Sequence, residues 1–169
     1  DILVREQDVA KSRNYLLKAG FRLVENFERE QSFFHDEREI ELDLHWGFTP
    51  FYFPIGLTFE SLWDSRQTHS LQSATIKSFS SEDLFLILCV QISKDCWERS
   101  QQIEHLSKVC DIATLLHTSP QLDWKALLAK ARQANIYRLV LFGACLAHRL
   151  FGTELPTNVT DLIYQEPVV

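Results

Sequence analysis

Residues 39–46 have the sequence EIELDLHW, in which polar and apolar residues alternate without interruption. Successive side chains of a β-strand point to opposite faces of a sheet, so this stretch predicts a strand that is apolar on one face and polar on the other. The apolar face is expected to hold Ile40, Leu42, Leu44 and Trp46. The polar face is expected to hold Glu39, Glu41, Asp43 and His45. The segments before and after this strand predict the elements around it.

A strand and a helix are predicted at the start of the chain. Residues 2–4 (ILV) have the composition of a short buried strand. A helix is expected to begin at Gln7 or Asp8, and Gly20 is expected to end it in the left-handed conformation. The inward face of this helix is expected to hold Val9, Leu16 and Leu17.

Further strands are predicted on both sides of the central one. A second strand is expected over residues 21–27 and a third through Phe33, followed by a turn at residues 35–38 (HDER). Residues 48–59 contain many aromatic residues and prolines, which predicts an irregular segment packed against the sheet. One more short strand is expected within residues 71–79.

The spacing of apolar residues changes from two to 3.6 after Ser80, which predicts helices for the rest of the chain. Ser80 and Asp83 have the spacing of an N-terminal capping box, Asp123 is a second N-terminal cap, and Gly152 is a C-terminal stop. The apolar stripes lie within residues 84–92, 103–116, 124–134 and 137–151.

Strands followed by helices are typical of the α+β class. We therefore predict a mixed-sheet α/β core over residues 1–79 and an all-helical domain of four or five helices over residues 80–169. Leu106 and Leu150 are expected on the inward faces of two of these helices.

Composition excludes several classes of protein. The 169 residues are 46% apolar and 24% charged, which is ordinary for a globular domain and unlike disordered or collagen-like chains. No run approaches the roughly 20 apolar residues of a membrane-spanning helix, so no membrane partner is expected. The net charge of −6, from 17 basic and 23 acidic residues, has the wrong sign for a protein that mainly coats nucleic acid.

The first residues and the cysteines predict the compartment. Residues 1–5 lack the basic and long apolar regions of a secretory signal. Cysteines at positions 89, 96, 110 and 145 are too widely spaced for a paired metal knuckle. We expect reduced core thiols and a cytoplasmic location. The chain contains no methionine, so we also expect that its true N-terminal segment lies before Asp1.

The polar face of the central strand is the strongest candidate for chemistry. Residues two apart on a strand lie about 7 Å apart on one face, so Glu41, Asp43 and His45 would project as a row of oxygen and imidazole groups. Asp1 leads the first strand and is a second possible contributor of a carboxylate. Carboxylates from neighbouring strands can hold Mg²⁺ or Mn²⁺ beside a phosphate substrate. The alternative is a strand whose polar face is simply in solvent.

Short motifs along the whole chain carry a family resemblance. They are Asp1-Ile2-Leu3-Val4, the helix ending in Ala19-Gly20-Phe21, Glu41–Trp46, Leu84–Cys89 with Lys94 and Trp97, Cys110–Ala113, and Leu122-Asp123-Trp124. In this order they resemble the uncharacterised nucleotidyltransferase family of bacteria. That family belongs to the polymerase-beta-like nucleotidyltransferase superfamily.

The resemblance implies a two-metal centre. Asp1 matches the second Asp of the family's Asp-x-Asp pair, and Asp43 matches the third carboxylate. These residues would bind two divalent ions, Mg²⁺ or Mn²⁺, that orient a nucleoside triphosphate for attack by an acceptor hydroxyl on the α-phosphate. Asp43 would also assist deprotonation of the acceptor.

Two further residues are candidates for substrate binding. Lys94, in the helical half, could reach the triphosphate as a point charge, or could be an ordinary exposed helical lysine. His45 could assist the metal centre or donate a proton, or could only form a hydrogen bond at the sheet edge.

The chain also departs from the family pattern. The first Asp of the pair and the glycine-containing helix that would cradle the phosphates should precede Asp1, and Gln91 and Asp95 stand where many members have histidines. Two alternatives therefore remain. One is a degenerate module that binds a nucleotide or a protein without turnover. The other is an interaction protein that uses the basic region from Lys125 to Arg149. The acceptor, whether protein, small molecule or RNA end, stays open.

Overall fold

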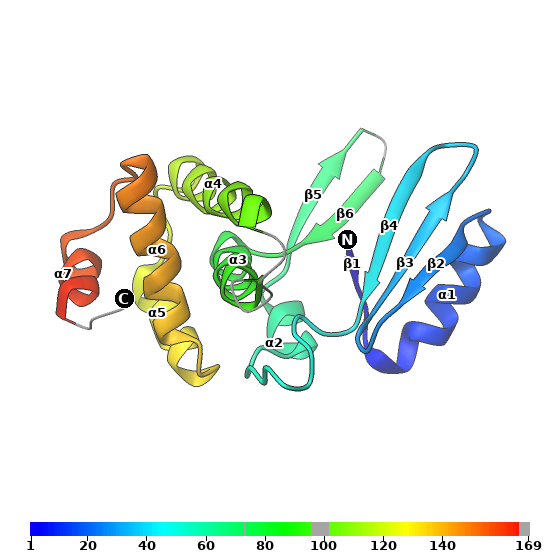
Figure 1. Ribbon diagram of the computed structural model, residues 1–169, viewed down its shortest axis with the longest axis horizontal. Helices are drawn as coiled ribbons and strands as arrows, with labels where there is room; N and C mark the ends of the chain where they lie inside the picture. Colours follow the sequence, from blue (N-terminus) through cyan, green and yellow to red (C-terminus); the bar gives the residue numbers. More distant parts are fainter. Residues whose placement is uncertain (73, 96–101, 166–169) are drawn as a thin grey trace. The chain divides into compact units, whose positions relative to one another are not determined.

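The computed structural model describes residues 1–72, 74–95 and 102–165. The chain folds into two compact units, residues 1–54 with 58–61 and residues 55–57 with 62–169. A four-stranded mixed sheet lies in the first unit, and the region from residue 81 onward is helical where it is described. The predicted α+β class is therefore confirmed (Figure 1).

The four-stranded sheet has the order β1-β4-β3-β2. Its strands are β1 (Ile2–Leu3), β2 (Arg22–Asn26), β3 (Glu30–His35) and β4 (Ile40–His45). β1 runs parallel to β4, while β2, β3 and β4 are joined as antiparallel neighbours. The prediction of a mixed sheet is confirmed, and its central strand lies within the alternating stretch that predicted it.

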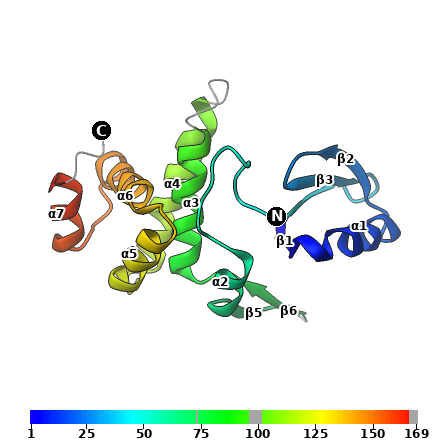
Figure 2. The ribbon, with the colours of Figure 1, turned by 90° about the horizontal axis from the view of Figure 1, so that it is seen from below.

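Helix α1 (Val9–Lys18) packs on one face of this sheet (Figure 2). The short 3₁₀ turn η1 (Glu6–Asp8) leads into it, and Gly20 adopts φ +92°, as expected of a residue that ends a helix in the left-handed region. Leu16 packs in a cluster with Phe33 and Leu44. The partly buried residues around this cluster are Val4, Val9, Phe21 and Leu42.

Three apolar residues that were expected inside are exposed, namely Ile2, Leu17 and Ile40. Ile2 lies on β1, a two-residue edge strand with a neighbour on one side only. Leu17 follows Leu16 and points about 100° away from it around the helix. Ile40 is the first residue of β4, directly after the turn, and lies beyond the cluster that buries Leu44. The apolar face of β4 is therefore buried only where α1 covers the strand.

The segment after β4 contains elements that the sequence pattern missed. Helix α2 (Phe59–Asp64) follows the irregular segment, and its first turn is held by Thr58 Oγ1, which accepts a hydrogen bond from Ser61 N at 3.2 Å. The strand expected within residues 71–79 is confirmed as β6 (Ala74–Ser78). Its partner β5 (Gln67–Leu71) was missed, and the two strands form a separate hairpin. All residues of both strands are exposed, so no alternation between core and solvent marks them.

In the described part of the chain, five helices follow the hairpin. They are α3 (Ser81–Asp95), α4 (Gln102–Thr118), α5 (Trp124–Gln133), α6 (Tyr137–Phe151) and α7 (Thr157–Gln165). The predicted caps are confirmed. Ser80 Oγ accepts from Asp83 N at 3.1 Å, Asp123 Oδ1 accepts from Ala126 N at 3.0 Å, and Gly152 adopts φ +66°.

Close packing of α3, α4 and α6 depends on a glycine. Gly143 on α6 is buried, and a β-carbon at this position would collide with the Cys89 sulfur on α3 and crowd Ile112 on α4. Burial raises the pKa of the Cys89 thiol well above its usual range, so this cysteine stays protonated and inert. Leu106 and Leu150, which were expected inside, are exposed on α4 and α6.

Cysteines 89, 110 and 145 are free thiols, and the first and last of these are buried. The prediction of reduced core thiols is therefore confirmed for these two, whereas Cys110 is only half-buried. Cys96 and Trp97 lie outside the described residues.

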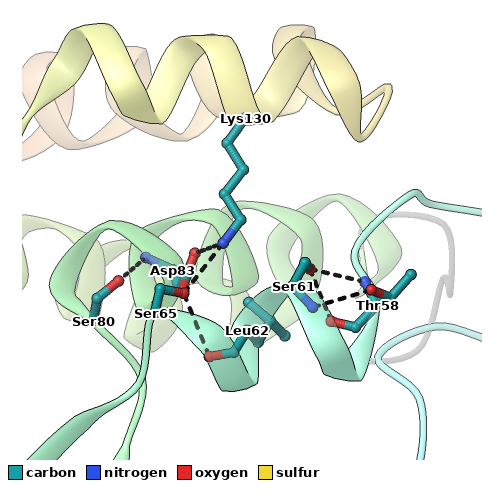
Figure 3. Close-up of polar contacts among 7 residues, drawn as sticks. All are labelled: Thr58, Ser61, Leu62, Ser65, Ser80, Asp83 and Lys130. Atoms are coloured by element: carbon teal, nitrogen blue, oxygen red, sulfur yellow. Dashed lines mark hydrogen bonds and ion pairs between the residues drawn. The ribbon is translucent and has the colours of Figure 1, made fainter.

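A buried ion pair joins α3 to α5 (Figure 3). The Asp83 side chain is 1% exposed, and its Oδ1 lies 2.5 Å from Lys130 Nζ. Asp83 Oδ2 also accepts a hydrogen bond from Ser65 Oγ, just after α2. Both oxygens of this carboxylate are thus satisfied, which explains why a charge is tolerated in the core of the second unit.

Leu44→Ala and Ile40→Ala form a matched pair on β4. Leu44 is 1% exposed and Ile40 is 45% exposed. We expect Leu44→Ala to lower the free energy of unfolding by about 2–5 kcal/mol, because a buried leucine leaves a cavity. Ile40→Ala should cost less than about 1 kcal/mol. Urea unfolding followed by circular dichroism measures both, and equal losses would contradict the finding that the cluster under α1 buries Leu44 and leaves Ile40 outside it.

Lys130→Met tests the buried ion pair. Removal of the ammonium group leaves the Asp83 charge without its main partner, so the free energy of unfolding should fall by about 3–5 kcal/mol. Lys125→Met is the matched control, because Lys125 is exposed on the same helix. Thermal unfolding of both variants measures the difference, and a Lys130→Met protein as stable as its control would rule out a structural role for the pair.

Candidate metal centre

The parallel pairing of β1 with β4 places Asp1 beside Asp43. Ile2 is in register with Leu44 and Leu3 with His45, so the residue before Ile2 falls next to the residue before Leu44. The pairing continues beyond β1, where Val4 N donates to His45 O at 2.9 Å. Because alternate residues share a face, Asp43 and His45 both point away from the face that buries Leu44. Two separate strands thus bring three polar side chains together.

The polar atoms of these three side chains converge. One ligand atom from each of Asp1, Asp43 and His45 lies within 4.8 Å of the other two. His45 Nε2 lies 3.8 Å from Asp1 Oδ2. Ligands of Mg²⁺ lie about 2.0–2.1 Å from the ion, so neighbouring ligands are about 3–4 Å apart. The group therefore needs only small side-chain adjustments to surround a divalent cation.

One oxygen of Asp43 supports a cation at this place. Asp43 Oδ1 is buried, and it has no hydrogen-bond partner among the residues that the structure describes. A buried carboxylate oxygen without a partner is costly, and a bound cation would remove that cost. The Asp1 side chain is 67% exposed, so one side of the group is open to solvent and to a substrate. Both the donor set and the buried oxygen fit a divalent metal.

Glu30 is a neighbour of this group that sequence reasoning missed. It lies directly opposite His45 in the β3–β4 ladder, and its Oε2 is 3.4 Å from His45 Nδ1. Both side chains are partly buried, at 31% exposure for Glu30 and 22% for His45. The segment EQSFFH of β3 shows no clean alternation, so only the strand register brings Glu30 to this place.

Glu41 and Lys94 lie outside the three-residue group. Glu41 is exposed on β4, opposite Phe34, and the expected row of three ligands on one strand is replaced by Asp43 and His45 with Asp1 from the neighbouring strand. Lys94 lies half-buried in the last turn of α3, in the second compact unit. Its role in substrate binding stays a prediction.

Comparison with known proteins gives the family. A family model described as an uncharacterised nucleotidyltransferase matches residues 1–152. Because the match covers most of the chain, the protein belongs to this family. Searches of curated proteins and of solved structures gave no match. Membership supports a general nucleotidyltransferase role with a nucleoside triphosphate as substrate, and enzymes of this kind generally use divalent metals. Among the described helices, none is long and apolar enough to cross a membrane.

Asp43→Asn tests the metal centre directly. The substitution keeps the shape of the side chain and removes its charge, so we expect Mn²⁺ affinity in isothermal titration to fall at least tenfold, or about 1.4 kcal/mol. The free energy of unfolding should change by less than about 1 kcal/mol. Glu41→Gln, two residues away on the same strand, should leave both quantities unchanged. A large loss of stability with unchanged Mn²⁺ affinity would make Asp43 a structural residue.

Proposed function

We propose that the protein is a metal-dependent nucleotidyltransferase that moves a nucleoside monophosphate from a triphosphate to an acceptor hydroxyl. The observation that supports this most is the convergence of Asp1, Asp43 and His45. A buried oxygen of Asp43 without a hydrogen-bond partner among the described residues supports it further. Family membership supports the same reaction class. Residues 1–79 would form the transferase core and residues 80–169 a helical domain.

Asp1 and Asp43 would hold the divalent ions, Mg²⁺ or Mn²⁺, in a two-metal arrangement. Bound there, the ions would neutralise the triphosphate and favour in-line displacement. The acceptor oxygen forms a bond to the α-phosphorus while the bond from that phosphorus to the bridging oxygen breaks, so pyrophosphate leaves. Asp43 would take the proton of the acceptor hydroxyl. In this reaction the protein would contribute positioning and charge neutralisation, and no covalent intermediate with the protein is needed.

The substrate contacts are proposed from chemistry. Lys94 would meet the negative triphosphate as a point charge. His45, next to both carboxylates, would assist the metal centre. The acceptor is a protein, a small molecule or an RNA end. The net charge of −6 argues only against extended nucleic-acid binding and does not choose among these three. We expect the enzyme to be bacterial and cytoplasmic.

Titration of ATP, GTP, CTP and UTP into the full-length protein tests this proposal. We expect one nucleotide to bind in the presence of Mg²⁺ or Mn²⁺ and to lose at least tenfold in affinity with EDTA, because the triphosphate then meets uncompensated carboxylates. Asp43→Asn should show the same loss with metal present, and Glu41→Gln should bind like the unchanged protein.

Turnover separates the enzyme from a non-catalytic module. Pyrophosphate release with the nucleotide that binds, abolished by Asp43→Asn, would support the transferase. Metal-dependent binding without pyrophosphate release on any tested class of acceptor would favour the degenerate module. If none of the four nucleotides binds, the proposal is overturned, and an interaction protein that uses the basic region from Lys125 to Arg149 is favoured.

A further inference from the structure

The His45 ring lies between the carboxylates of Asp1 and Glu30. Its Nε2 lies 3.8 Å from Asp1 Oδ2, within the group that converges with Asp43, and its Nδ1 lies 3.4 Å from Glu30 Oε2. The two ring nitrogens of a histidine are distinct, and the contact made by one decides what the other can do. An Nδ1–H directed at Glu30 leaves the Nε2 lone pair directed at Asp1 and Asp43.

The geometry points to Glu30 as a positioning residue. We propose that Glu30 holds His45 as a third ligand of this centre, and that the centre therefore selects Mn²⁺ over Mg²⁺. The inference rests on the proposed metal site and deepens it, because it states which of the two proposed ions is preferred and names a residue that determines the preference. Histidines that bind metals almost always direct their second ring nitrogen at a carboxylate, a carbonyl or a water.

The local backbone holds Glu30 in place. Glu30 and His45 are paired in the β3–β4 ladder, and this ladder continues where Trp46 N donates to Arg29 O at 3.0 Å. On the β2 side, Phe27 N donates to Glu30 O at 2.8 Å. The backbone of Glu30 is therefore fixed by strand register, which keeps its side chain on the same face as that of His45.

The neighbouring charges are engaged elsewhere. Glu28 Oε2 accepts a hydrogen bond from Phe51 N at 3.2 Å, and the Arg29 guanidinium lies over the Phe51 ring at 4.1 Å from its centre. Both side chains thus hold the segment after β4. Of the three consecutive charged residues at this turn, Glu30 is the one whose carboxylate faces His45.

Metal choice follows from the donor set. Mg²⁺ prefers oxygen ligands and keeps several waters, whereas imidazole nitrogen favours first-row transition ions. Mn²⁺ accepts carboxylates as Mg²⁺ does and gains from the added nitrogen. Two carboxylates with one imidazole, from Asp1, Asp43 and His45, therefore favour Mn²⁺ where carboxylates alone would discriminate little.

Competition binding tests the proposal on the full-length protein. Electron paramagnetic resonance of free Mn²⁺, with Mg²⁺ as competitor, gives both affinities. We expect Mn²⁺ to bind at least tenfold more tightly than Mg²⁺. Both His45→Asn and Glu30→Ala should lower Mn²⁺ affinity by about 10–100-fold and affect Mg²⁺ less, so that the preference disappears. Glu30→Gln should retain most of the preference, because its amide oxygen can still accept from Nδ1–H. Glu41→Gln is the control and should change neither affinity.

A measurement without metal distinguishes a positioning role of Glu30 from a purely structural one. Nitrogen-15 spectra of the histidine rings, recorded at about pH 8 where an ordinary imidazole is neutral, should show His45 as the single Nδ1–H tautomer. Its signals are assigned by their absence in His45→Asn. In Glu30→Ala the ring should become a mixture of tautomers, and in Glu41→Gln it should not change.

The outcomes distinguish this inference from the proposed function. Equal Mn²⁺ and Mg²⁺ affinities in the unchanged protein, or a preference that survives in both Glu30→Ala and His45→Asn, would overturn the inference and leave the metal site standing. Binding of neither ion by the unchanged protein would overturn both. Loss of the preference in Glu30→Ala with its retention in Glu30→Gln supports the inference, and the ring spectra show whether the cause is the orientation of His45.

Discussion

The parallel pairing of β1 with β4 is the interaction on which the candidate site depends. The helix and two antiparallel strands between them form the crossover that parallel neighbours require. The same alternation that sends Leu44 into the cluster with Leu16 and Phe33 sends Asp43 and His45 to the other face. A slip of one residue would exchange the two faces, so burial of one leucine side chain fixes the orientation of two candidate ligands. The register of β4 thus determines both the packing of Leu44 and the placement of the candidate ligands.

The carboxylates of Asp83 and Asp43 differ in how their charge is balanced. Asp83 is inside the second unit with Lys130 on one oxygen and Ser65 on the other, so its charge is neutralised within the fold. Asp43 keeps a buried oxygen without a partner among the described residues, and its nearest polar neighbours include a second carboxylate from Asp1. Two like charges at one place destabilise a fold unless a cation joins them. This contrast, more than acidity alone, is why we propose that the metal centre lies in the first unit.

Local patterns in the sequence predicted the elements that have local causes. The strand around Asp43, helix α1 with its glycine end, and the helices capped by Ser80 and Asp123 all follow from periodicity and caps within a few residues. The β5–β6 hairpin was predicted only in part: a strand was expected where β6 lies, and β5 was missed, because both strands are exposed on every residue and show no alternation between core and solvent. Glu30 was missed for another reason: its contact with His45 exists only through the pairing of two strands. Asp1 was named from its place before a strand and from the family resemblance, and the register of β1 supplied its distance to His45.

Anomalous diffraction at the manganese absorption edge, from crystals of the full-length protein grown with Mn²⁺, tests the central claim most directly. The account predicts a manganese peak bounded by carboxylate oxygens of Asp1 and Asp43 and by Nε2 of His45, with Nδ1 of His45 facing Glu30. A peak elsewhere, or clear density in which Asp43 contacts only protein groups and no ion, would contradict the claim that these strands are paired to hold a metal.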